Sequence, residues 1–503
     1  MSPSGGVPQS SVVRVAVDPA TDAGENLVDA FRTAASSVPV VETGPTGVTA
    51  LEPLVLCTHE GRTAFHADPD VDDVDEFVDT LESDTLPTEG ADAVVEHDPD
   101  TDTLPVPRSG PLAVGTRRVL GPCGWVDPED PAAHDFLDVD TTLEPVADSG
   151  LLGRGRGDAV TDEPVFEEWT TARDADGESV VVVNANDADD RSLADETLLA
   201  GAPYPILDAA VAVAEFVDAS DVVVYCNEAD DRLHERLRRS VDAAREEFSV
   251  VPQVVTGPDT FRAGEETMAL EAMEGTDRIE ARVRPPGPAE YGLYGRPTVV
   301  HSPRTFAQVY RALVDPDSFD PDDADPGTRL VTVTGDVDAP ATVELPTGRT
   351  LADATDAVDF STFETAVVGG QFGGLSADLD VSASAPALRS ADLGTNGVVE
   401  LLDDSRCVVA EVGTRARFAS EENCGRCVPC REGSKQLVEL LRDVYDGEYD
   451  ADGLRELAGV MRRSSTCDFG VGAARPVATA LDEFEPEFRA HANGRCPSGT
   501  CEL

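Results

Sequence analysis

The chain has 503 residues, 41% apolar residues and a net charge of −60, and these values exclude several classes of protein. A chain of this length should fold as roughly three or four domains with apolar cores, which excludes wholesale disorder. No apolar run approaches the roughly 18–20 residues that cross a bilayer. Residues 1–11 lack the basic and apolar regions of a signal peptide. We therefore expect a soluble, cytoplasmic protein without a transmembrane segment.

The negative charge is spread over every segment of the chain, and Lys435 is the only lysine. Such a surface repels itself at low ionic strength, whereas molar salt shortens the screening length to about 3 Å. This distribution predicts adaptation to a salt-rich cytoplasm, as in an extreme halophile. The alternative, an acidic surface for one basic partner, requires a localised block of charge, and the sequence has none. Nucleic acid is a poor partner for the same reason.

The first predicted elements form a small α/β domain. Residues 12–18 are typical of a buried strand, residues 24–36 of a helix, and the segment around Leu56 of a second strand. Acidic turns around 68–73 and 98–102 predict loops, and residues 105–111 resemble a linker.

Strands and helices alternate between residues 179 and 255. Strands are expected at 179–185, 221–227 and 250–255, with helices at 205–216 and 230–248. Such alternation predicts a mainly parallel sheet that is covered on both faces.

The last third of the chain changes character twice. Residues 328–358 predict a compact β-rich module, and the chain becomes helical from about 432. Further helices are expected at 453–462 and at about 476–488.

Six of the ten cysteines lie in the last eighty residues, and four of these predict an iron–sulfur cluster. Cys424, Cys427 and Cys430 have the spacing C-x2-C-x2-C, and Cys467 follows just past a predicted helix. A [4Fe-4S] cluster needs four thiolates, and a helix from about Arg431 would direct N–H groups at this anion. Structural zinc is the alternative, although it favours two separated cysteine pairs; a set of disulfides is the third possibility.

The remaining cysteines carry weaker signals. For Cys496 and Cys501, near the end of the chain, three interpretations stay open: a metal site, a redox disulfide or a frayed tail. The other four are interpreted as buried small apolar residues: Cys57, Cys123, Cys226 and Cys407.

Two further motifs are candidates for cofactor binding. The glycine-rich segment 149–157 would let backbone N–H groups approach a phosphate, although an ordinary glycine turn is the alternative; its candidate residues are Gly153, Arg154, Gly155 and Gly157. The segment 264–267 places two adjacent carboxylates after a strand, where a solvated pair is the ordinary expectation in so acidic a chain. Its residues are Gly264, Glu265, Glu266 and Thr267.

Taken together, these motifs resemble the NADH-binding flavoprotein subunit of respiratory complex I. They resemble the related diaphorase subunits of NAD-linked hydrogenases and formate dehydrogenases as well or better. Besides segment 264–267, the matching segments are RVLGPCGWVDPED (118–130), SGLLGRG (149–155), GRPTVV (295–300), VVGGQFGG (367–374), LGTNGVVEL (393–401) and ENCGRCVPCREG (422–433). The resemblance spans most of the chain in the order that the family has.

The resemblance implies a multidomain α/β protein in four parts. These are a degenerate thioredoxin-like domain (1–110), a Rossmann-like FMN- and NADH-binding α/β domain (111–325), a β-grasp-like soluble-ligand-binding module (326–400) and a helical iron–sulfur domain (401–503). It implies that electrons pass from NADH through FMN to the [4Fe-4S] cluster and on to other redox subunits of a dehydrogenase complex. It also adds Asn184, Asn186 and Asp187 to the candidate flavin site. No catalytic residue is assigned.

The sequence departs from the family pattern at the flavin site. Glu168 precedes Trp169 where the family has a lysine, and His301 and Ser302 replace paired asparagines. A carboxylate near a flavin phosphate is repulsive, and the aromatic residue that should stack on the nucleotide is missing unless Phe166 replaces it. The alternative function is therefore a non-catalytic iron–sulfur or scaffold subunit with a decayed flavin site.

The N-terminal domain departs from the pattern as well. Residues 43–53 resemble the [2Fe-2S] loop of thioredoxin-like domains, but Pro45 and Thr49 stand where two thiolates would be expected. Cys57 alone cannot hold a cluster, so this domain is expected to be a scaffold.

Overall fold

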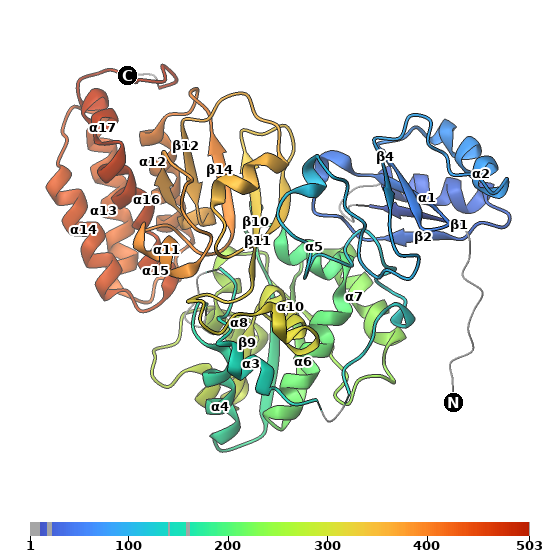
Figure 1. Cartoon of the computed structure of the whole chain (residues 1–503). Helices are drawn as coiled ribbons and strands as arrows, with labels where there is room; N and C mark the ends of the chain where they lie inside the picture. The colour runs from blue at the N-terminus through green and yellow to red at the C-terminus, as the bar shows by residue number, and fades with distance from the viewer. Residues whose placement is uncertain (1–10, 18–22, 139–140, 157–160, 502–503) are drawn as a thin grey trace.

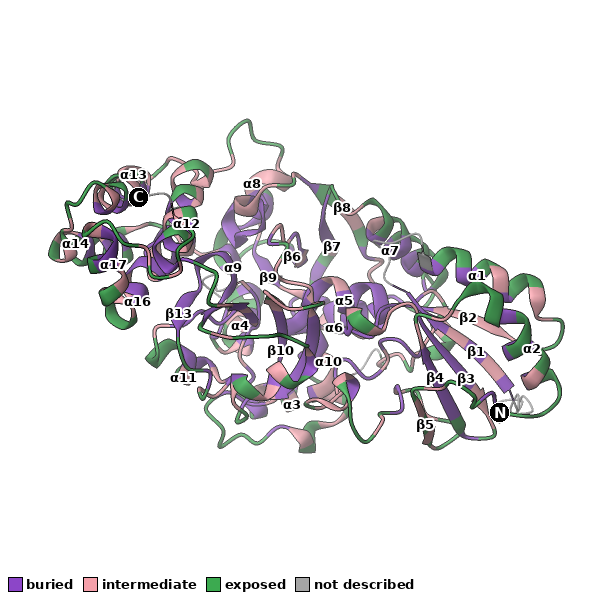
Figure 2. Cartoon of the chain, turned by 90° about the horizontal axis from the view of Figure 1, so that it is seen from above, coloured by how far each residue is buried: buried purple, intermediate pink, exposed green. Residues whose placement is uncertain are grey.

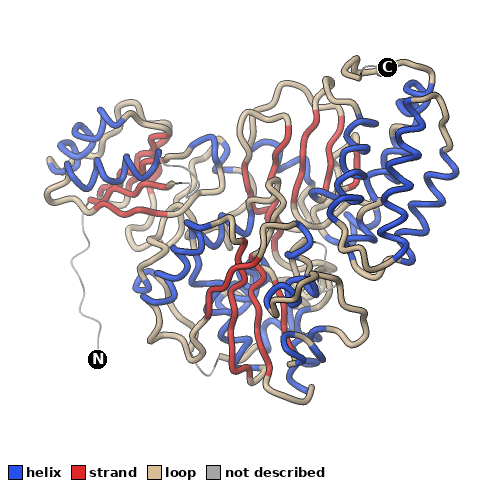
Figure 3. Tube along the Cα trace, turned by 180° about the vertical axis from the view of Figure 1, so that it is seen from behind, coloured by secondary structure: helices blue, strands red, loops and turns tan. Residues whose placement is uncertain are grey.

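The computed structural model describes residues 11–17, 23–138, 141–156 and 161–501. The described residues form three sheets and a group of helices at the C-terminal end (Figure 1). Seen from behind, the N-terminal sheet and the C-terminal helices lie at opposite ends of the molecule, with the other two sheets between them (Figure 3). The predicted multidomain α/β architecture with a helical C-terminal region is confirmed at this level.

The first sheet has the strand order β2-β1-β3-β4-β5, with β1 and β2 parallel and the other pairs antiparallel. Residues of α1 and α2 share one apolar cluster with alternate residues of β1 and β3, so both helices cover the same face. The elements are β1 (Ser11–Ala16), α1 (Ala23–Ala34), β2 (Val40–Thr43), β3 (Leu54–His59), β4 (Arg62–Ala67), α2 (Val74–Glu82) and β5 (Ala93–Glu96).

The second sheet confirms the prediction of parallel strands, in the order β8-β7-β6-β9. Alternate valines of β6 enter different cores: Val181 and Val183 pack with α6 and α10, whereas Val180 and Val182 pack with α8. The long elements are β6 (Ser179–Ala185), α6 (Pro203–Phe216), β7 (Ala219–Asn227), α7 (Asp231–Ala243), β8 (Gln253–Gly257), α8 (Glu266–Met273), β9 (Thr298–His301) and α10 (Pro303–Val314).

Shorter helices complete this central part: α3 (Glu144–Ser149), α4 (Val165–Asp174), α5 (Ala194–Gly201), α9 (Pro288–Tyr291) and the 3-10 turn η5 (Phe261–Gly264). The helix expected at 230–248 ends at Ala243 instead. The chain turns there, which brings Phe248 into the core of the parallel sheet.

The third sheet is mixed, with the strand order β11-β10-β14-β12-β13 and one parallel pair, β10 with β14. Its strands share an apolar cluster with Ala16 and Leu56 of the first sheet. The elements are β10 (Thr328–Gly335), β11 (Ala341–Pro346), η8 (Leu351–Ala357), β12 (Thr365–Val368), η9 (Gly370–Phe372), β13 (Gly374–Ser376), α11 (Ala385–Ser390) and β14 (Val398–Leu402).

The C-terminal helices begin earlier than the sequence predicted, at Val408 rather than near residue 432. The helix expected at 476–488 is divided at Phe484. Pro486, in the first turn of the next helix, has no backbone N–H with which to continue the helical hydrogen bonds. The elements are α12 (Val408–Glu422), α13 (Val428–Tyr445), α14 (Ala451–Ser464), α15 (Asp468–Gly472), α16 (Arg475–Glu483) and α17 (Glu485–Ala492).

Buried residues line the strands and the inner faces of the helices, and exposed residues lie on the outer faces (Figure 2). Among the described residues no single helix is long and apolar enough to cross a membrane. The pair α5 and α6 meets the length and composition test only when taken together, and it is bent by 95°.

Candidate functional site

A cavity of about 270 Å³ lies where three parts of the fold meet. Asp187 and Asp189 follow β6 at the carboxyl edge of the parallel sheet, Gly394 and Asn396 precede β14 of the mixed sheet, and Asp468 begins α15. Open parallel sheets bind ligands at this edge of their strands. The cavity is therefore the candidate binding site, and its lining includes Asp468 and Phe469, which directly follow Cys467.

Most of the predicted flavin-site residues gather at a narrower recess beside this cavity. It is lined by Arg154, Gly155, Asn184, Asn186, Asp187 and Glu266, together with His301 and Ser302. Gly153 shapes the loop instead, because its amide and carbonyl groups pair with Glu163 and Asp162. Gly157 lies outside the described residues.

Six buried polar atoms around this recess have no hydrogen-bond partner among the described residues. They are Arg156 Nη1, Asn184 Oδ1, Asn186 Oδ1, Asp187 Oδ2, Glu266 Oε1 and His301 Nδ1. Leaving such groups unpaired costs about 1–3 kcal/mol each. Because two of them are nitrogens and four are oxygens, they fit a ligand that both accepts and donates hydrogen bonds. The ribityl hydroxyls and the imide of FMN meet this requirement.

Position 264 has no room for a side chain, so it requires glycine. A Cβ at this position would lie 2.0 Å from Arg156 Nη1 and 2.1 Å from the carbonyl oxygen of Asn186. The carbonyl oxygen of Gly264 also accepts a hydrogen bond of 2.8 Å from Asn184 Nδ2, which turns Asn184 Oδ1 into the recess. Glycine here therefore lets the loop carrying Arg156 pack against the start of α8.

The adjacent carboxylates Glu265 and Glu266 are both buried, so the expectation of a solvated pair is wrong. Glu265 caps α8 by accepting hydrogen bonds from Met268 N and from the hydroxyl of Thr267. Glu266 pairs with Arg284 at 2.5 Å, but burial still raises the pKa of Glu266 to about 7. Arg284 was not identified from the sequence, because nothing in its local pattern links it to residues 264–267.

The departures at Glu168 and His301 compensate one another in the fold. Glu168 Oε2 lies 3.3 Å from His301 Nε2, and the same nitrogen accepts a 2.9 Å hydrogen bond from the indole of Trp169. Burial raises the pKa of Glu168 well above its ordinary value and lowers the pKa of His301 to about 3. His301 is therefore neutral near pH 7 and the contact is no ion pair, while burial disfavours the charged form of Glu168 that would repel a phosphate.

The neutral form of His301 has a further consequence for the recess. Since Nε2 is an acceptor, the ring proton lies on Nδ1, which is one of the unpaired atoms. His301 thus offers an N–H donor, as the amide of an asparagine would. The hydroxyl of Ser302 is already engaged, because it donates to Arg154 O at 2.8 Å and accepts from Thr305 N at the start of α10.

Replacing Glu168 by glutamine is expected to stabilise the flavin-free chain increasingly as pH rises. An acid whose folded pKa is raised binds its proton more tightly in the folded state, so stability falls by about 1.4 kcal/mol per pH unit between its unfolded and folded pKa values. Glutamine removes this penalty while keeping the shape of the side chain. Thermal unfolding of both proteins from about pH 5 to pH 8 should diverge by about 1–3 kcal/mol.

The matched control for this substitution is Glu167→Gln, which changes the exposed neighbour on the same helix. Its unfolding curves should follow those of the unchanged protein at every pH. Parallel curves for Glu168→Gln would show that Glu168 is ionised in the fold.

The arginines that border the recess are paired with buried carboxylates. Arg154 lies 2.7 Å from Asp325, and Arg304 lies 2.8 Å from Asp195. Arg156 lies 3.8 Å from Asp187 and has its guanidinium 4.0 Å from the ring centre of Phe261. These cations offset the acidic walls, and Arg156 has a free N–H for a phosphate or carbonyl oxygen.

Aromatic side chains separate the cavity from the cysteine loop. Phe166 is not one of them, because it packs against Trp169 and Phe216 in the core. The cavity is instead lined by Phe261, Phe372 and Phe469. Their ring centres lie 4.8–5.9 Å apart, and Phe469 follows Cys467 by two residues.

The four cysteines predicted to bind a cluster lie around two helix starts. Cys424 follows α12, Cys427 and Cys467 are the N-caps of α13 and α15, and Cys430 is in the first turn of α13. Gly425 holds the left-handed conformation (φ 78°) between the first two thiols. Arg431 fastens the loop through a 2.8 Å hydrogen bond to the carbonyl oxygen of Gly425. Helix N-termini favour an anion between these thiols.

The thiols of this loop influence one another electrostatically. Burial raises the pKa of Cys430 to about 12, and the neighbouring Cys427 and Cys424 add to the shift. Burial also raises the pKa of Cys467. Burial opposes ionisation at Cys427 too, but hydrogen bonds from the amides of Thr466 and Cys430 hold its pKa below the ordinary value. A bound metal would supply the positive charge that four clustered thiolates need.

In the N-terminal part of the chain, Cys57 lies on β3 and is fully buried. Burial raises the pKa of its thiol to about 12. This is the environment of an inert apolar residue.

Comparison with known proteins matches two stretches of the chain, one holding the recess and one holding the cysteine loop, to known families. Residues 146–311 match the Nuo51 FMN-binding domain, and residues 411–491 match the NADH-ubiquinone oxidoreductase-F iron-sulfur binding region. The first stretch contains the recess, and the second contains the four cysteines.

Whole-chain relatives agree with these matches. An NADH-quinone oxidoreductase subunit of Streptomyces coelicolor is 31% identical over 390 residues, which cover 71% of this chain and 84% of that protein. The NADP-reducing hydrogenase subunit HndC of Solidesulfovibrio fructosivorans is 28% identical over 429 residues, which cover 78% and 86%. A chain of an NAD⁺-reducing [NiFe]-hydrogenase crystal structure superposes with a TM-score of 0.65 at 26% identity, covering 97% of this chain and 86% of that one.

The parallel sheet with its polar recess, the cysteine loop and these similarities lead to one conclusion: the chain belongs to the NADH-ubiquinone oxidoreductase-F family, which includes the related hydrogenase subunits.

Proposed function

We propose that this chain is the NADH-oxidising subunit of a redox complex, with a flavin site in the recess and a [4Fe-4S] cluster in the cysteine loop. The observation that carries the proposal is the continuity of the two sites. A recess with six unpaired polar atoms shares Arg156 and Asp187 with the cavity, and the lining of the cavity includes Phe469, two residues from Cys467.

The chain's own residues would bind and orient the cofactor and the substrate. His301 Nδ1 and Arg156 Nη1 are placed to donate hydrogen bonds. The unpaired oxygens of Asn184, Asn186, Asp187 and Glu266 are placed to accept them. FMN held by these residues would supply hydride acceptance from NADH and one-electron transfer toward an iron–sulfur centre. The larger cavity, lined by Phe261 and Phe372, is the space left for the nicotinamide nucleotide.

Cys424, Cys427, Cys430 and Cys467 are the proposed cluster ligands. Support comes from their place inside the matched iron–sulfur region and from the two helix N-termini at the loop. The aromatic side chains between the recess and Cys467 exclude water from the path that electrons would take.

The domain assignments made from the sequence remain our proposal. The strand order β2-β1-β3-β4-β5, with a parallel β-α-β start and an antiparallel hairpin before α2, supports a thioredoxin-like domain in residues 1–110. The order β11-β10-β14-β12-β13 supports a β-grasp-like module in residues 326–400. We assign residues 111–325 to the Rossmann-like domain and residues 401–503 to the iron–sulfur domain.

The partners we propose are other redox subunits of a dehydrogenase complex, because the similar proteins are named as subunits of NADH-quinone oxidoreductases and hydrogenases. A cytoplasmic location also remains a prediction.

The test uses the full chain purified anaerobically in molar KCl and mixed with FMN. Binding is expected to quench flavin fluorescence, and NADH is expected to bleach the flavin absorbance. If the chain binds neither FMN nor NADH while keeping its iron, it is a non-catalytic iron–sulfur subunit instead. This second function was suggested by the sequence, through the residues that replace the family's lysine and paired asparagines: Glu168, His301 and Ser302.

Gly264→Ala is expected to weaken FMN binding by at least about tenfold, since the new methyl group displaces Arg156 at a cost of about 1–3 kcal/mol. Fluorescence titration measures the change. The matched control is Gly413→Ala on α12, where an added Cβ meets nothing within 4 Å. Equal FMN affinity of Gly264→Ala and the unchanged chain would place the flavin elsewhere.

A further inference from the structure

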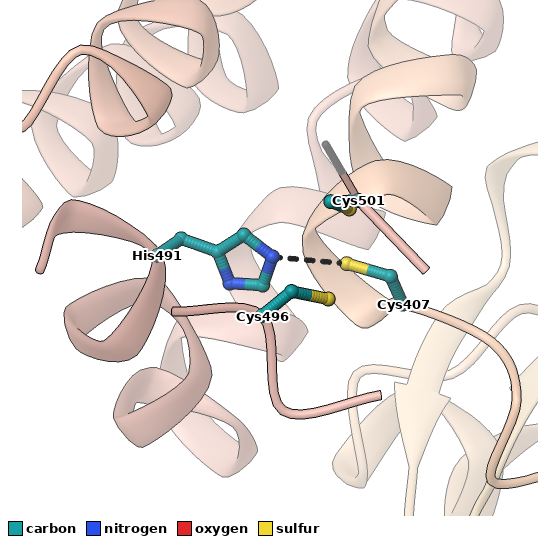
Figure 4. Close-up of side chains that lie close together, drawn as sticks. All are labelled: Cys407, His491, Cys496 and Cys501. Carbon is teal, nitrogen blue, oxygen red and sulfur yellow. Dashed lines mark hydrogen bonds between the residues drawn. The ribbon is translucent and has the colours of Figure 1, made fainter. Parts of the chain in front are cut away.

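A second group of metal-binding side chains lies at the C-terminal end of the molecule, apart from the cysteine loop. Its four ligand atoms all lie within 4.8 Å of one another, and they belong to Cys407, His491, Cys496 and Cys501. Figure 4 shows the imidazole ring and the thiols turned toward one another. One prediction from the sequence changes here, because Cys407 is not an isolated apolar residue. Of the three interpretations left open for Cys496 and Cys501, this grouping supports the metal site.

The spacing of these atoms suits a single tetrahedral ion. With bonds of about 2.3 Å to sulfur, two thiolates on one zinc ion lie about 3.8 Å apart. His491 Nε2 lies 3.2 Å from Cys407 Sγ, so the group needs only small side-chain adjustments to close on an ion. Two of the four residues, Cys407 and His491, are buried, as expected of a structural site.

The histidine is already held in the tautomer that metal binding requires. His491 Nδ1 lies 2.8 Å from the backbone carbonyl oxygen of Glu487, to which it donates its proton. The lone pair is therefore on Nε2, the nitrogen that faces Cys407. Histidine ligands of metal ions are typically oriented by such a hydrogen bond to a carbonyl group.

The tail is folded so that both of its thiols point into the group. Gly499 holds a left-handed conformation (φ 75°) between Cys496 and Cys501, and the Ser498 hydroxyl lies 3.2 Å from Cys496 Sγ. The hydroxyl of Tyr445 lies 3.8 Å from Cys501 Sγ, and its ring packs against His491. Both hydroxyls can donate to thiolate sulfur.

We propose that one zinc ion is bound here by three thiolates and one imidazole: Cys407, Cys496, Cys501 and His491. Three thiolates and one imidazole form an established structural zinc set, whereas a [4Fe-4S] cluster takes four thiolates. Three of the four ligands also lie outside residues 411–491, the region matched by the iron–sulfur family.

The ion joins the tail to two helices. Cys407 caps α12, and His491 lies in the last turn of α17, so binding fixes residues 493–501 across the ends of both. Cys424 of the cysteine loop follows the other end of α12, a helix of 15 residues, which spans about 22 Å. The zinc site and the iron–sulfur site are therefore separate and are lost independently.

Metal analysis of the full chain, purified anaerobically without chelators from zinc-supplemented medium, tests the proposal. One zinc per chain is expected in addition to the iron. Zinc K-edge absorption should give three sulfur neighbours at about 2.3 Å and one nitrogen at about 2.0 Å. This measurement needs no variant, so a folding defect cannot obscure it.

Variants then locate the ion. Cys496→Ala and Cys501→Ala should each lose zinc but keep the full iron content, and the buried Cys226→Ala should keep both. Wild-type protein without stoichiometric zinc would overturn the proposal, and so would zinc bound by four sulfurs. Zinc that persists in the variant carrying both Cys496→Ala and Cys501→Ala would overturn it too. A Cys496–Cys501 disulfide in the anaerobic protein would overturn it as well.

Discussion

Cys467→Ala is expected to abolish the [4Fe-4S] cluster while leaving flavin binding and zinc in place. Cys467 is the one proposed ligand that comes from outside the C-x2-C-x2-C loop, and the remaining thiols can hold at most three corners of a cubane. Analysis of iron and sulfide should show that the content of one cluster is lost, and EPR of the reduced protein should show no [4Fe-4S] signal. NADH should still bleach the flavin absorbance, because the recess residues lie on other elements.

The control for this variant is Cys226→Ala, which removes a buried thiol from the parallel sheet and should leave iron unchanged. A residual three-iron cluster in Cys467→Ala would also identify Cys467 as the fourth ligand. An unchanged iron content and EPR signal would exclude it. Stoichiometric zinc without iron in the wild-type loop would replace the cluster assignment with the structural-zinc alternative.

Raising KCl from about 0.1 M to about 3 M is expected to raise the apparent unfolding temperature by about 10–20 °C. The net charge of −60 generates repulsion that is long-ranged in dilute salt and is screened within about 3 Å at molar salt. Salt also weakens exposed ion pairs such as Arg462 with Asp392, at 2.6 Å, but such pairs contribute only about 0–1 kcal/mol each. Relief of the repulsion therefore dominates.

Thermal scans followed by circular dichroism measure this shift. Sucrose at matched osmolality is the control, because it strengthens burial without screening charge. A midpoint that is constant across the KCl series, or that moves equally with sucrose, would contradict adaptation to high salt. The ion pair of Arg329 with Asp162, at 2.9 Å, is buried and should be retained at all salt concentrations.

Several parts of the site were predictable from the sequence because their signal is local. The cysteine loop follows from the spacing of Cys424, Cys427 and Cys430 within seven residues. The parallel sheet follows from valine-rich strands that alternate with helices between 179 and 257. The helix α12 was missed, although its buried residues Val408, Val412 and Ala419 have helical spacing.

Other features depend on residues that only the fold brings together. The sequence alone suggested a charged Glu168 that repels phosphate, whereas burial raises the pKa of Glu168 and leaves its contact His301, far along the chain, uncharged near pH 7. Burial changes the cost of ionisation, and no local pattern reveals how deeply a side chain will be buried. For the same reason, the sequence did not reveal that Glu265 and Glu266 are both buried rather than solvated.

By itself, then, the sequence determined the family and the parallel sheet, and it predicted the four cluster cysteines, three of them from the spacing of one short loop. The tertiary structure alone decided which polar atoms of the flavin recess remain unpaired and which thiols meet at the C-terminal end. Cys407 and His491 are 84 positions apart, and they become neighbours only because α12 and α17 pack side by side. Contacts of this kind are set by the packing of whole elements, which local spacing does not encode.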